Sequence, residues 1–447
     1  MNLPRRLITT ATGIAVFAAA AAAIALGSPD SSTKVSHASR QHPNQVLEWN
    51  QIFIETLIAA GTLNSSSQRL GAIVHTAIFD AYNGIKRSYT PIYVQNVDGN
   101  GQSLVPHGAS RRAAVIAAAY TALVALFPSR ETQLSESYAA SIAALSDDSG
   151  DGKSRERGIA WGTQVARAVL AWRAADGFSA TYPAFTGGTA VGQWRPIAPA
   201  SSMSAQPLAF TLPFVVESNT QFRPAPPRAL TSSTYTDDFT AVKALGRLTG
   251  STRTDAQTEL APFWEGNASV HWNQAANQLA RANHLSLSKS NRLLAVLNIA
   301  MADTAFTIWS AKRYYGADPA AVTWRPLTAI TLADTDGIAD TAADLDWRPL
   351  VTTPSHPEYP AGHPAQNGAA ATVLLGQLAD AQTFTLTTSG RPSQTYTGIS
   401  QARTDGNNAR IWGGMHYPST VAISDTVGEA IARYVDANSM QPLRDHR

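Results

Sequence analysis

Two short segments of the sequence carry the residue types that hold a tetrahedral oxyanion. Residues 360–363 end in Gly362-His363, and residues 410–416 run from Arg410 through two glycines to His416. Glycine lets the backbone N–H groups approach an anion, and arginine offers a planar fork of donors that matches two oxyanion oxygens. One imidazole can bond to the central atom while the other moves a proton. The pattern therefore predicts a site for phosphate or vanadate.

Bulk composition limits the class of protein. The chain has 447 residues, of which 44% are hydrophobic and 15% are charged, so it can bury a large core. Lys and Arg number 34 against 32 acidic residues, and no cysteine is present. This near balance excludes the basic footprint of a nucleic-acid-binding protein, so no nucleic-acid partner is expected.

The N-terminus has the pattern of an export signal. Arg5 and Arg6 precede an alanine-rich apolar run over residues 7–26, which predicts a signal peptide at 1–27 followed by a linker at 28–43. Export by the twin-arginine or the Sec route would make the protein secreted or periplasmic, with no stable membrane span after processing. An uncleaved anchor is the alternative, since the run is almost long enough to cross a bilayer.

Helical periodicity dominates the remainder and predicts a mainly α fold, a multi-helix bundle. We expect an N-terminal helical region at 44–235, a catalytic helical bundle at 236–437 and a tail at 438–447. Apolar residues recur at helical spacing over 70–85, 112–127, 157–175 and 288–315. Residues 178–236 are rich in Pro, Gly, Ser and Thr with interleaved aromatics, which predicts a long ordered connection. Only 383–388 alternates as a strand does.

Further candidate residues precede the two segments. Trp309 and Lys312 are three apart and share a face of the helix at 288–315. Lys312 would point into a site, although a lysine that extends to solvent at a helix end is the structural alternative. Arg325 stands in a Trp-Arg-Pro triplet, where the proline stiffens the backbone, yet the chain has three such triplets. His356 is either a site residue or an ordinary loop histidine.

Taken in order, these motifs resemble the vanadium haloperoxidase and type-2 phosphatidic acid phosphatase superfamily. The set is Trp309 with Lys312, residues 324–326, residues 360–363 and residues 410–416. Residues 72–83, 221–224 and 252–264 are similar to the exported bacterial branch of vanadium-dependent haloperoxidases, so the resemblance covers nearly all of the chain beyond its N-terminal segment.

The resemblance implies a role for each motif residue. His416 would be the axial ligand of vanadate or the nucleophile toward phosphorus, and His363 the acid–base residue. Lys312, Arg325, Arg410 and the Gly362 N–H would bind the oxyanion oxygens. Trp309 and His356 would tune halide choice, since histidine at the latter position is typical of bromoperoxidases.

Three departures from the family pattern stand out. Ala361 replaces the usual serine, so one hydroxyl donor is lost. Lys312 and Arg325 are 13 residues apart where the family usually has seven, because residues 316–321 look inserted. The family commonly has aspartate four residues after the second histidine, and here that residue is Thr420. Asp425 or a backbone carbonyl would then have to orient His416.

The leading hypothesis is a vanadate-dependent haloperoxidase that uses hydrogen peroxide to oxidise a halide, with bromide or iodide favoured, and passes it to a small organic acceptor. It needs vanadate and neither haem nor flavin. The alternative is an exported acid phosphatase that hydrolyses a phosphate ester through a phosphohistidine on His416. A third reading is a degenerate relative that binds only an anion or a partner surface. Acidic residues at 334–340 form either a calcium loop or a solvated loop.

Overall fold

The computed structural model describes residues 44–145 and 152–443, which form one compact unit. The predicted signal peptide at 1–27 and the linker at 28–43 lie outside the described residues. The division of the remainder near residue 235 stays a prediction.

Helices make up most of the described chain, which confirms the mainly α prediction. The N-terminal helices are α1 (Gln45–Ala59), α2 (Asn64–Lys86), α3 (Arg111–Leu126), η1 (Pro128–Arg130), α4 (Glu131–Ala143), α5 (Gly152–Ala174) and η2 (Gln206–Ala209). The later helices are α6 (Ser233–Leu245), α7 (Asp255–Phe263), α8 (Ala268–Ala282), α9 (Leu287–Ala317), α10 (Pro326–Thr331), η3 (Ala333–Thr335), α11 (Gly362–Leu375), α12 (Ile399–Trp412) and α13 (Pro418–Asn438).

Side chains at the N-caps explain where several helices begin. Asn44, Asn267 and Ser286 each accept backbone N–H groups of the first turn of α1, α8 and α9. Thr254 and Gln257 form a reciprocal capping box at the start of α7. These bonds satisfy donors that a helix leaves unpaired at its N-terminus.

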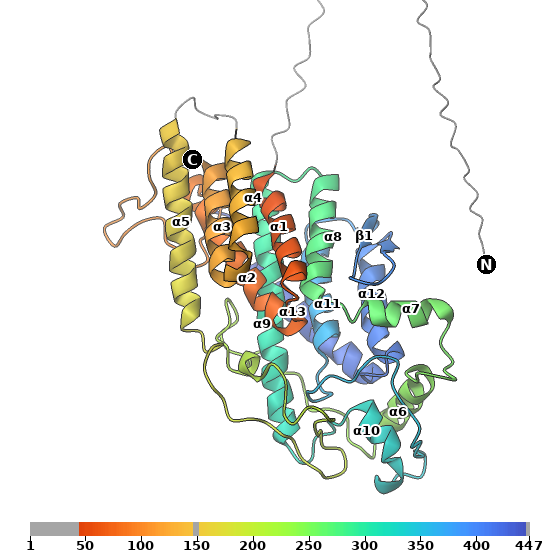
Figure 1. Cartoon of the computed structure of the whole chain (residues 1–447). Coiled ribbons are helices and arrows are strands. Elements are labelled where there is room, and N and C mark those ends of the chain that lie inside the picture. Colours follow the sequence, from red (N-terminus) through yellow and green to blue (C-terminus); the bar gives the residue numbers. More distant parts are fainter. Residues whose placement is uncertain (1–43, 146–151, 444–447) are drawn as a thin grey trace, which may run out of the picture. The chain divides into compact units, whose positions relative to one another are not determined.

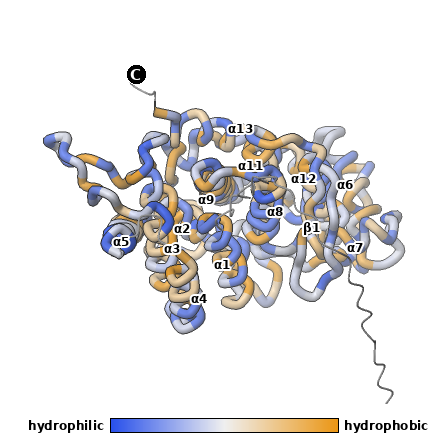
Figure 2. Tube along the Cα trace, turned by 90° about the horizontal axis from the view of Figure 1, so that it is seen from above, coloured by the Kyte–Doolittle hydropathy of each residue, from blue (hydrophilic) through white to orange (hydrophobic). Residues whose placement is uncertain are grey.

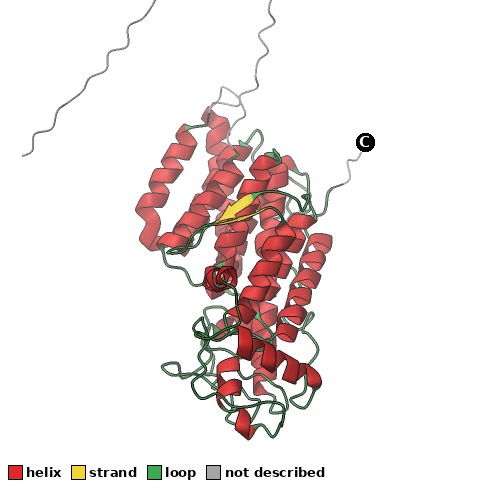
Figure 3. Ribbon diagram, turned by 90° about the vertical axis from the view of Figure 1, so that its right-hand side faces the viewer, coloured by secondary structure: helices red, strands yellow, loops and turns green. Residues whose placement is uncertain are grey.

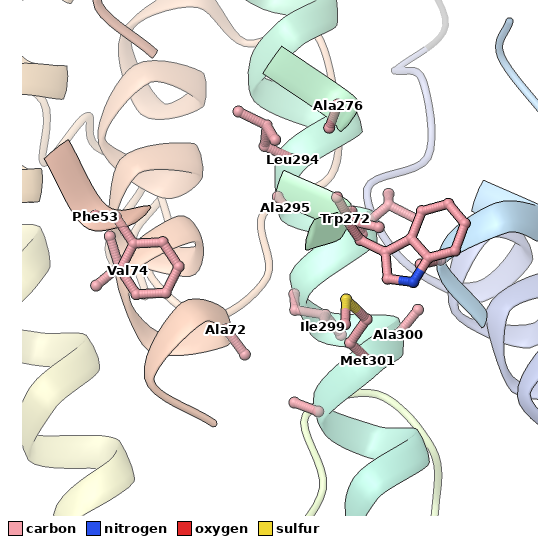
Figure 4. Close-up of a cluster of buried hydrophobic side chains, with 14 of the residues drawn as sticks. Phe53, Ala72, Val74, Trp272, Ala276, Leu294, Ala295, Ile299, Ala300 and Met301 are labelled. Carbon is pink, nitrogen blue, oxygen red and sulfur yellow. The ribbon is translucent and has the colours of Figure 1, made fainter. Parts of the chain in front are cut away.

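The long helix α9 lies between the N-terminal helices and the C-terminal ones (Figure 1). α2 packs against α3, α5 and one side of α9, and α11 packs against α9, α12 and α13. The close-up in Figure 4 shows Phe53, Ala72 and Val74 on one side of α9 and Trp272 on the other. Along outer helices such as α4, hydrophobic and hydrophilic residues are mixed (Figure 2), as one buried and one exposed face require.

Burial in this core accounts for the hydropathy of α9. It is the one straight helix of the described residues with the length and hydropathy of a membrane span, and 94% of its apolar window is buried inside the protein. The bent pair of α3 with η1 and α4 passes the same test only if it is counted as one span.

Between α5 and α6 the chain runs as a long connection with only η2 in it, as the composition predicted. The buried carboxylate of Asp303 on α9 accepts the backbone N–H groups of Phe214, Val215 and Val216 at 2.7, 2.8 and 3.0 Å. These bonds fix the connection beside α9. Loops of this kind gather at one end of the helices in Figure 3.

Strand structure is limited to one short hairpin within the described residues. The predicted strand at 383–388 is observed as β1 (Phe384–Leu386), and it pairs antiparallel with β2 (Gln394–Tyr396), which the sequence did not indicate. The yellow arrows in Figure 3 lie on the outside of the helices.

Candidate active site

Five elements supply the candidate residues. α9 carries Trp309 and Lys312, and Arg325 is the N-cap residue of α10. The segment before α11 contributes His356, and α11 begins at Gly362 and His363. Arg410 lies in the last turn of α12, and His416 precedes α13. The contacts below join these residues into one cluster.

Arg325 is the centre of the cluster. It is fully buried, and its Nε and Nη1 donate to the carbonyl oxygens of His356 and Met415 at 2.8 and 2.9 Å. Nη1 also reaches Nε2 of His416 at 3.1 Å, and Nη2 reaches Nδ1 of His356 at 2.8 Å. Burial, with Arg410 adding repulsion, lowers the pKa of Arg325 to about 9. The guanidinium therefore aligns both histidines.

Lys312 does not extend to solvent. Its side chain is fully buried, and Nζ donates to the carbonyl oxygens of Pro357 and Glu358 at 2.6 and 3.2 Å. Helix α9 continues to Ala317 and ends before Pro319, so the extra residues leave Lys312 beside the cluster. Burial, and then the charge of Arg325, hold the pKa of this lysine well below its usual range.

Arg410 is the third buried cation. Its Nη1 donates to the Trp264 carbonyl at 3.4 Å, and Nη2 contacts Sδ of Met415 at 3.2 Å. Its Nε is buried and has no hydrogen-bond partner. Burial lowers the pKa of Arg410 to about 10. A guanidinium with such weak partners has donor capacity left for an anion.

His416 is held from both ring nitrogens. Nδ1 lies 3.1 Å from Oε1 of Glu358, and Nε2 faces Arg325. Burial and the three neighbouring cations keep the pKa of His416 well below its ordinary value. Glu358 is itself fully buried, and burial raises its pKa.

His363 has a separate set of partners, one on α2 and one in the segment between α7 and α8. Nε2 lies 3.2 Å from the Gly266 carbonyl and 3.4 Å from Nδ2 of Asn64. Because a carbonyl only accepts, the closer contact places a proton on Nε2 and leaves Nδ1 as the basic nitrogen. Burial and Arg410 lower the pKa of His363 well below its usual value.

Trp309 and His356 form one side of the cluster. Their ring centroids are 5.3 Å apart, and a Cβ added at Gly362 would come within 3.3 Å of the Trp309 ring. Lys312 and His416 are buried, whereas His356 and His363 are only half-buried. The side of the cluster that is open to solvent therefore lies at His356 and His363.

The start of α11 adds backbone donors. The first N–H groups of a helix have no acceptor within it and favour negative charge. Ala361 is the N-cap residue and gives no side-chain cap. Its own N–H donates to Oγ of Ser424 at 2.7 Å, which attaches this N-terminus to α13.

The donor set fits an oxyanion. Lys312, Arg325 and Arg410 bring three buried cations together, and Glu358 is the buried carboxylate that contacts the cluster. Within the described ranges, no three His, Cys, Asp or Glu side chains gather as they would around a metal cation. Excess positive charge, the partnerless Nε of Arg410 and a neutral imidazole nitrogen suit vanadate or phosphate.

Comparison with known proteins agrees with this geometry. Residues 292–445 match the model of the VCPO second helical-bundle domain, and all eight candidate residues fall within them. The chain is similar to the crystal structure of a bacterial vanadium-dependent iodoperoxidase, with a TM-score of 0.75, 22% identity, and coverage of 91% of this chain and 98% of that one.

A second similar structure is that of a holo-type bacterial vanadium-dependent chloroperoxidase, with a TM-score of 0.62, 17% identity, and coverage of 83% and 91% of the two chains. A comparison with curated proteins gave no match. The chain therefore has the fold of the vanadium haloperoxidases, and its C-terminal part matches one domain of that family, in agreement with the resemblance of the motifs.

One expectation about the surroundings of His416 is wrong. Asp425 does not reach that ring; both its oxygens pair with Arg403, at 2.8 and 2.7 Å. The carboxylate comes instead from Glu358, which the sequence analysis missed. The only signal available was a single acidic residue inside a proline-rich segment, two residues before Pro360.

The acidic segment at 334–340 has a structural explanation. Oδ1 of Asp334 accepts the Ala343 N–H, and Asp336 accepts from the N–H of Ile338 and from Oγ1 of Thr341. These bonds organise the loop around its own backbone.

Proposed function

We propose that this protein is a vanadate-dependent haloperoxidase that oxidises a halide with hydrogen peroxide to hypohalous acid. The observation that supports it most is the position of His416 among three buried cations, with Nε2 facing Arg325 and with Glu358 at Nδ1. The fold shared with vanadium haloperoxidases is the second support.

Different residues of the cluster would bind vanadate, donate to its oxygens and transfer the proton. His416 would bind vanadate through Nε2, while Lys312, Arg325, Arg410 and the Gly362 N–H would donate to its oxygens. Bound vanadate would supply a Lewis-acidic centre that activates hydrogen peroxide toward halide. His363 would take the proton of the incoming peroxide at Nδ1, because its Nε2 is engaged by Gly266.

We assign bromide or iodide as the halide. His356 faces Trp309, and its Nδ1 accepts from Arg325, so Nε2 carries the proton and can donate to a halide. Of the two similar structures, one is an iodoperoxidase and the other a chloroperoxidase, which leaves His356 as the residue on which the assignment depends.

An acid phosphatase acting through a phosphohistidine on His416 is the second candidate. Ala361 favours it, because a buried methyl stands where a further hydroxyl donor to vanadate would be expected. The same cations would bind phosphate, and His363 would protonate the leaving oxygen of the ester.

A paired assay separates the two candidates. Purified apo protein is divided: one half is loaded with orthovanadate and assayed for bromide and iodide oxidation with hydrogen peroxide, and the other is assayed for phosphate-ester hydrolysis. The proposal expects oxidation in the loaded half only, and loss of that activity in His363→Ala. Hydrolysis by the apo half without any oxidation by the loaded half would refute it.

The cellular setting is part of the proposal. The N-terminal pattern supports a secreted or periplasmic enzyme, with a small organic compound as halogen acceptor. Mass spectrometry of the N-terminus of protein recovered outside the cytoplasm would show cleavage near residue 27.

A further inference from the structure

We propose that Glu358 is the positioning residue of His416: it holds the ring with its proton on Nδ1 and its lone pair on Nε2, which faces Arg325 and would bond the central atom of the oxyanion. This inference rests on the proposed function for its consequence, since the oxyanion is taken to be vanadate. The geometry behind it stands without that assumption.

Two neighbours specify the same tautomer independently. A carboxylate accepts only, so the 3.1 Å contact of Glu358 Oε1 requires a proton on Nδ1 of His416. A guanidinium donates only, so the 3.1 Å contact of Arg325 Nη1 requires Nε2 to be unprotonated. The ring is therefore held in the single form that can bond a central atom through Nε2.

Glu358 is in turn fixed by other bonds. Its Oε1 also accepts the Tyr417 N–H at 3.1 Å, and its Oε2 accepts from Oγ1 of Thr420 at 3.0 Å. Three donors from one stretch of chain thus converge on a fully buried carboxylate. A carboxylate satisfied in this way cannot rotate without losing several hydrogen bonds at once.

The series of bonds continues into the long connection. Nη1 of Arg228 donates to Thr420 Oγ1 at 2.9 Å, Nε of Arg228 pairs with Asp238 at 2.7 Å, and the guanidinium lies 4.3 Å from the Tyr417 ring centroid. Thr420 Oγ1 accepts from Arg228 and donates to Glu358. Arg228 therefore fixes the direction of the hydroxyl that holds Glu358.

This arrangement suggests a relocation experiment. Because Thr420 Oγ1 lies between Glu358 and Arg228, an aspartate at residue 420 would place a carboxylate beside both the His416 ring and a guanidinium. Glu358→Ala combined with Thr420→Asp would then restore a partner for Nδ1 from the other side of the same pocket.

The test compares Glu358→Ala, Glu358→Gln and the double variant with the wild type. Orthovanadate affinity is measured by equilibrium dialysis, and the ring nitrogens of His416 are followed by NMR of anion-free, ¹⁵N-histidine-labelled protein. We expect wild-type His416 as one tautomer with the proton on Nδ1. Glu358→Ala should weaken orthovanadate binding about 10- to 100-fold and give a second tautomer. Glu358→Gln keeps a hydrogen-bond acceptor but removes the charge, and it should weaken orthovanadate binding about tenfold.

Asp425→Asn is the matched control. It removes a carboxylate from α13 that pairs with Arg403 and does not contact His416, so affinity and His416 signals should match the wild type. Should Glu358→Ala fail to fold, Glu358→Gln decides the question. The double variant should return to within about fivefold of wild-type affinity, since relocation restores the lost partner.

Three results would overturn the inference. One is orthovanadate affinity within twofold of wild type in the Glu358 single variants. Another is a loss of affinity with unchanged His416 signals, and the third is a double variant whose tautomer is restored but whose affinity is not. A wild-type protein that binds no orthovanadate would refute the proposed function, while the NMR comparison would still decide the role of Glu358.

Discussion

Replacing Arg325 with lysine tests whether a fork of donors, rather than charge alone, builds the site. Arg325 makes four contacts, two with carbonyl oxygens and two with imidazole nitrogens, from three different nitrogens. A lysine keeps the positive charge but presents its donors from a single nitrogen. It cannot reach the His356 and Met415 carbonyls and an anion at once.

The expected loss follows from these contacts. While Arg325 donates to the two carbonyl oxygens, its guanidinium can still donate one aligned hydrogen bond to an oxyanion. A lysine at the same position would lack this hydrogen bond. A hydrogen bond to a charged group contributes roughly 1.5–3 kcal/mol. Since about 1.4 kcal/mol corresponds to tenfold, Arg325→Lys should weaken orthovanadate binding by about 10- to 150-fold. Neutral substitutions are less informative, because they also relieve repulsion with Lys312 and Arg410.

Isothermal titration of orthovanadate onto apo protein is the assay. Arg403→Lys serves as the control, because Arg403 makes a comparable two-oxygen contact with Asp425 but has no contact with the cluster. Its affinity should equal that of the wild type. Affinity within twofold of wild type in Arg325→Lys would refute the reasoning, since charge alone would then suffice.

Three further predictions concern the surrounding fold. In Gly428→Ala the new Cβ would overlap the Ala365 backbone, so guanidinium denaturation should show that the unfolding free energy falls by more than about 3 kcal/mol. In the control Gly376→Ala the nearest atom to the new Cβ is 3.4 Å away, and the unfolding free energy should fall by about 1 kcal/mol or less. Equal losses in the two variants would contradict the packing of α11 on α13. Burial lowers the pKa of His75 to about 3 in the folded protein. In the unfolded chain this histidine takes up a proton below pH about 6.5, whereas in the folded protein it stays neutral at the same pH. The free energy of unfolding therefore falls as the pH falls. Urea denaturation at pH 6 and 5 should therefore give His75→Asn a slope about 1 kcal/mol per pH unit shallower than wild type, and parallel slopes would contradict this. Ala361→Ser supplies the side-chain N-cap that α11 lacks, so thermal denaturation should show an unfolding free energy about 1 kcal/mol higher than that of the wild type. A lower melting temperature would contradict this prediction, because it would mean that the buried hydroxyl has no hydrogen-bond partner.

Local signals in the sequence predicted the helices and the main site motifs. Periodicity located α9, and the glycines beside His363 and His416 marked the two segments that converge. The inserted residues 316–321 at the end of α9 left the position of Lys312 undecided, because spacing along a chain does not fix the direction of a side chain in space. The structure answers this through the burial of Nζ and its two carbonyl acceptors.

The residues that the sequence could not reveal act across long separations. Asn64 and Gly266 contact His363 from positions 299 and 97 residues away, and Arg228 reaches Thr420 across 192 residues. None of them belongs to a motif, and each makes its contact through tertiary packing. Glu358 was missed for a related reason: residue type alone does not distinguish a solvated carboxylate from a buried one that accepts three hydrogen bonds.

The distribution of charge explains why the site needs the whole fold. Three cations are buried near each other, and the buried carboxylate of Glu358 is directed at the back of His416 rather than between them. Burial lowers the pKa of each cation, so the folded protein bears an electrostatic penalty in the absence of an anion. Only a rigid fold can hold these three cations where no carboxylate of the described chain lies between them. Helix α9 holds Lys312, the N-cap of α10 holds Arg325, and the last turn of α12 holds Arg410, so an oxyanion relieves the penalty without rearrangement of the backbone.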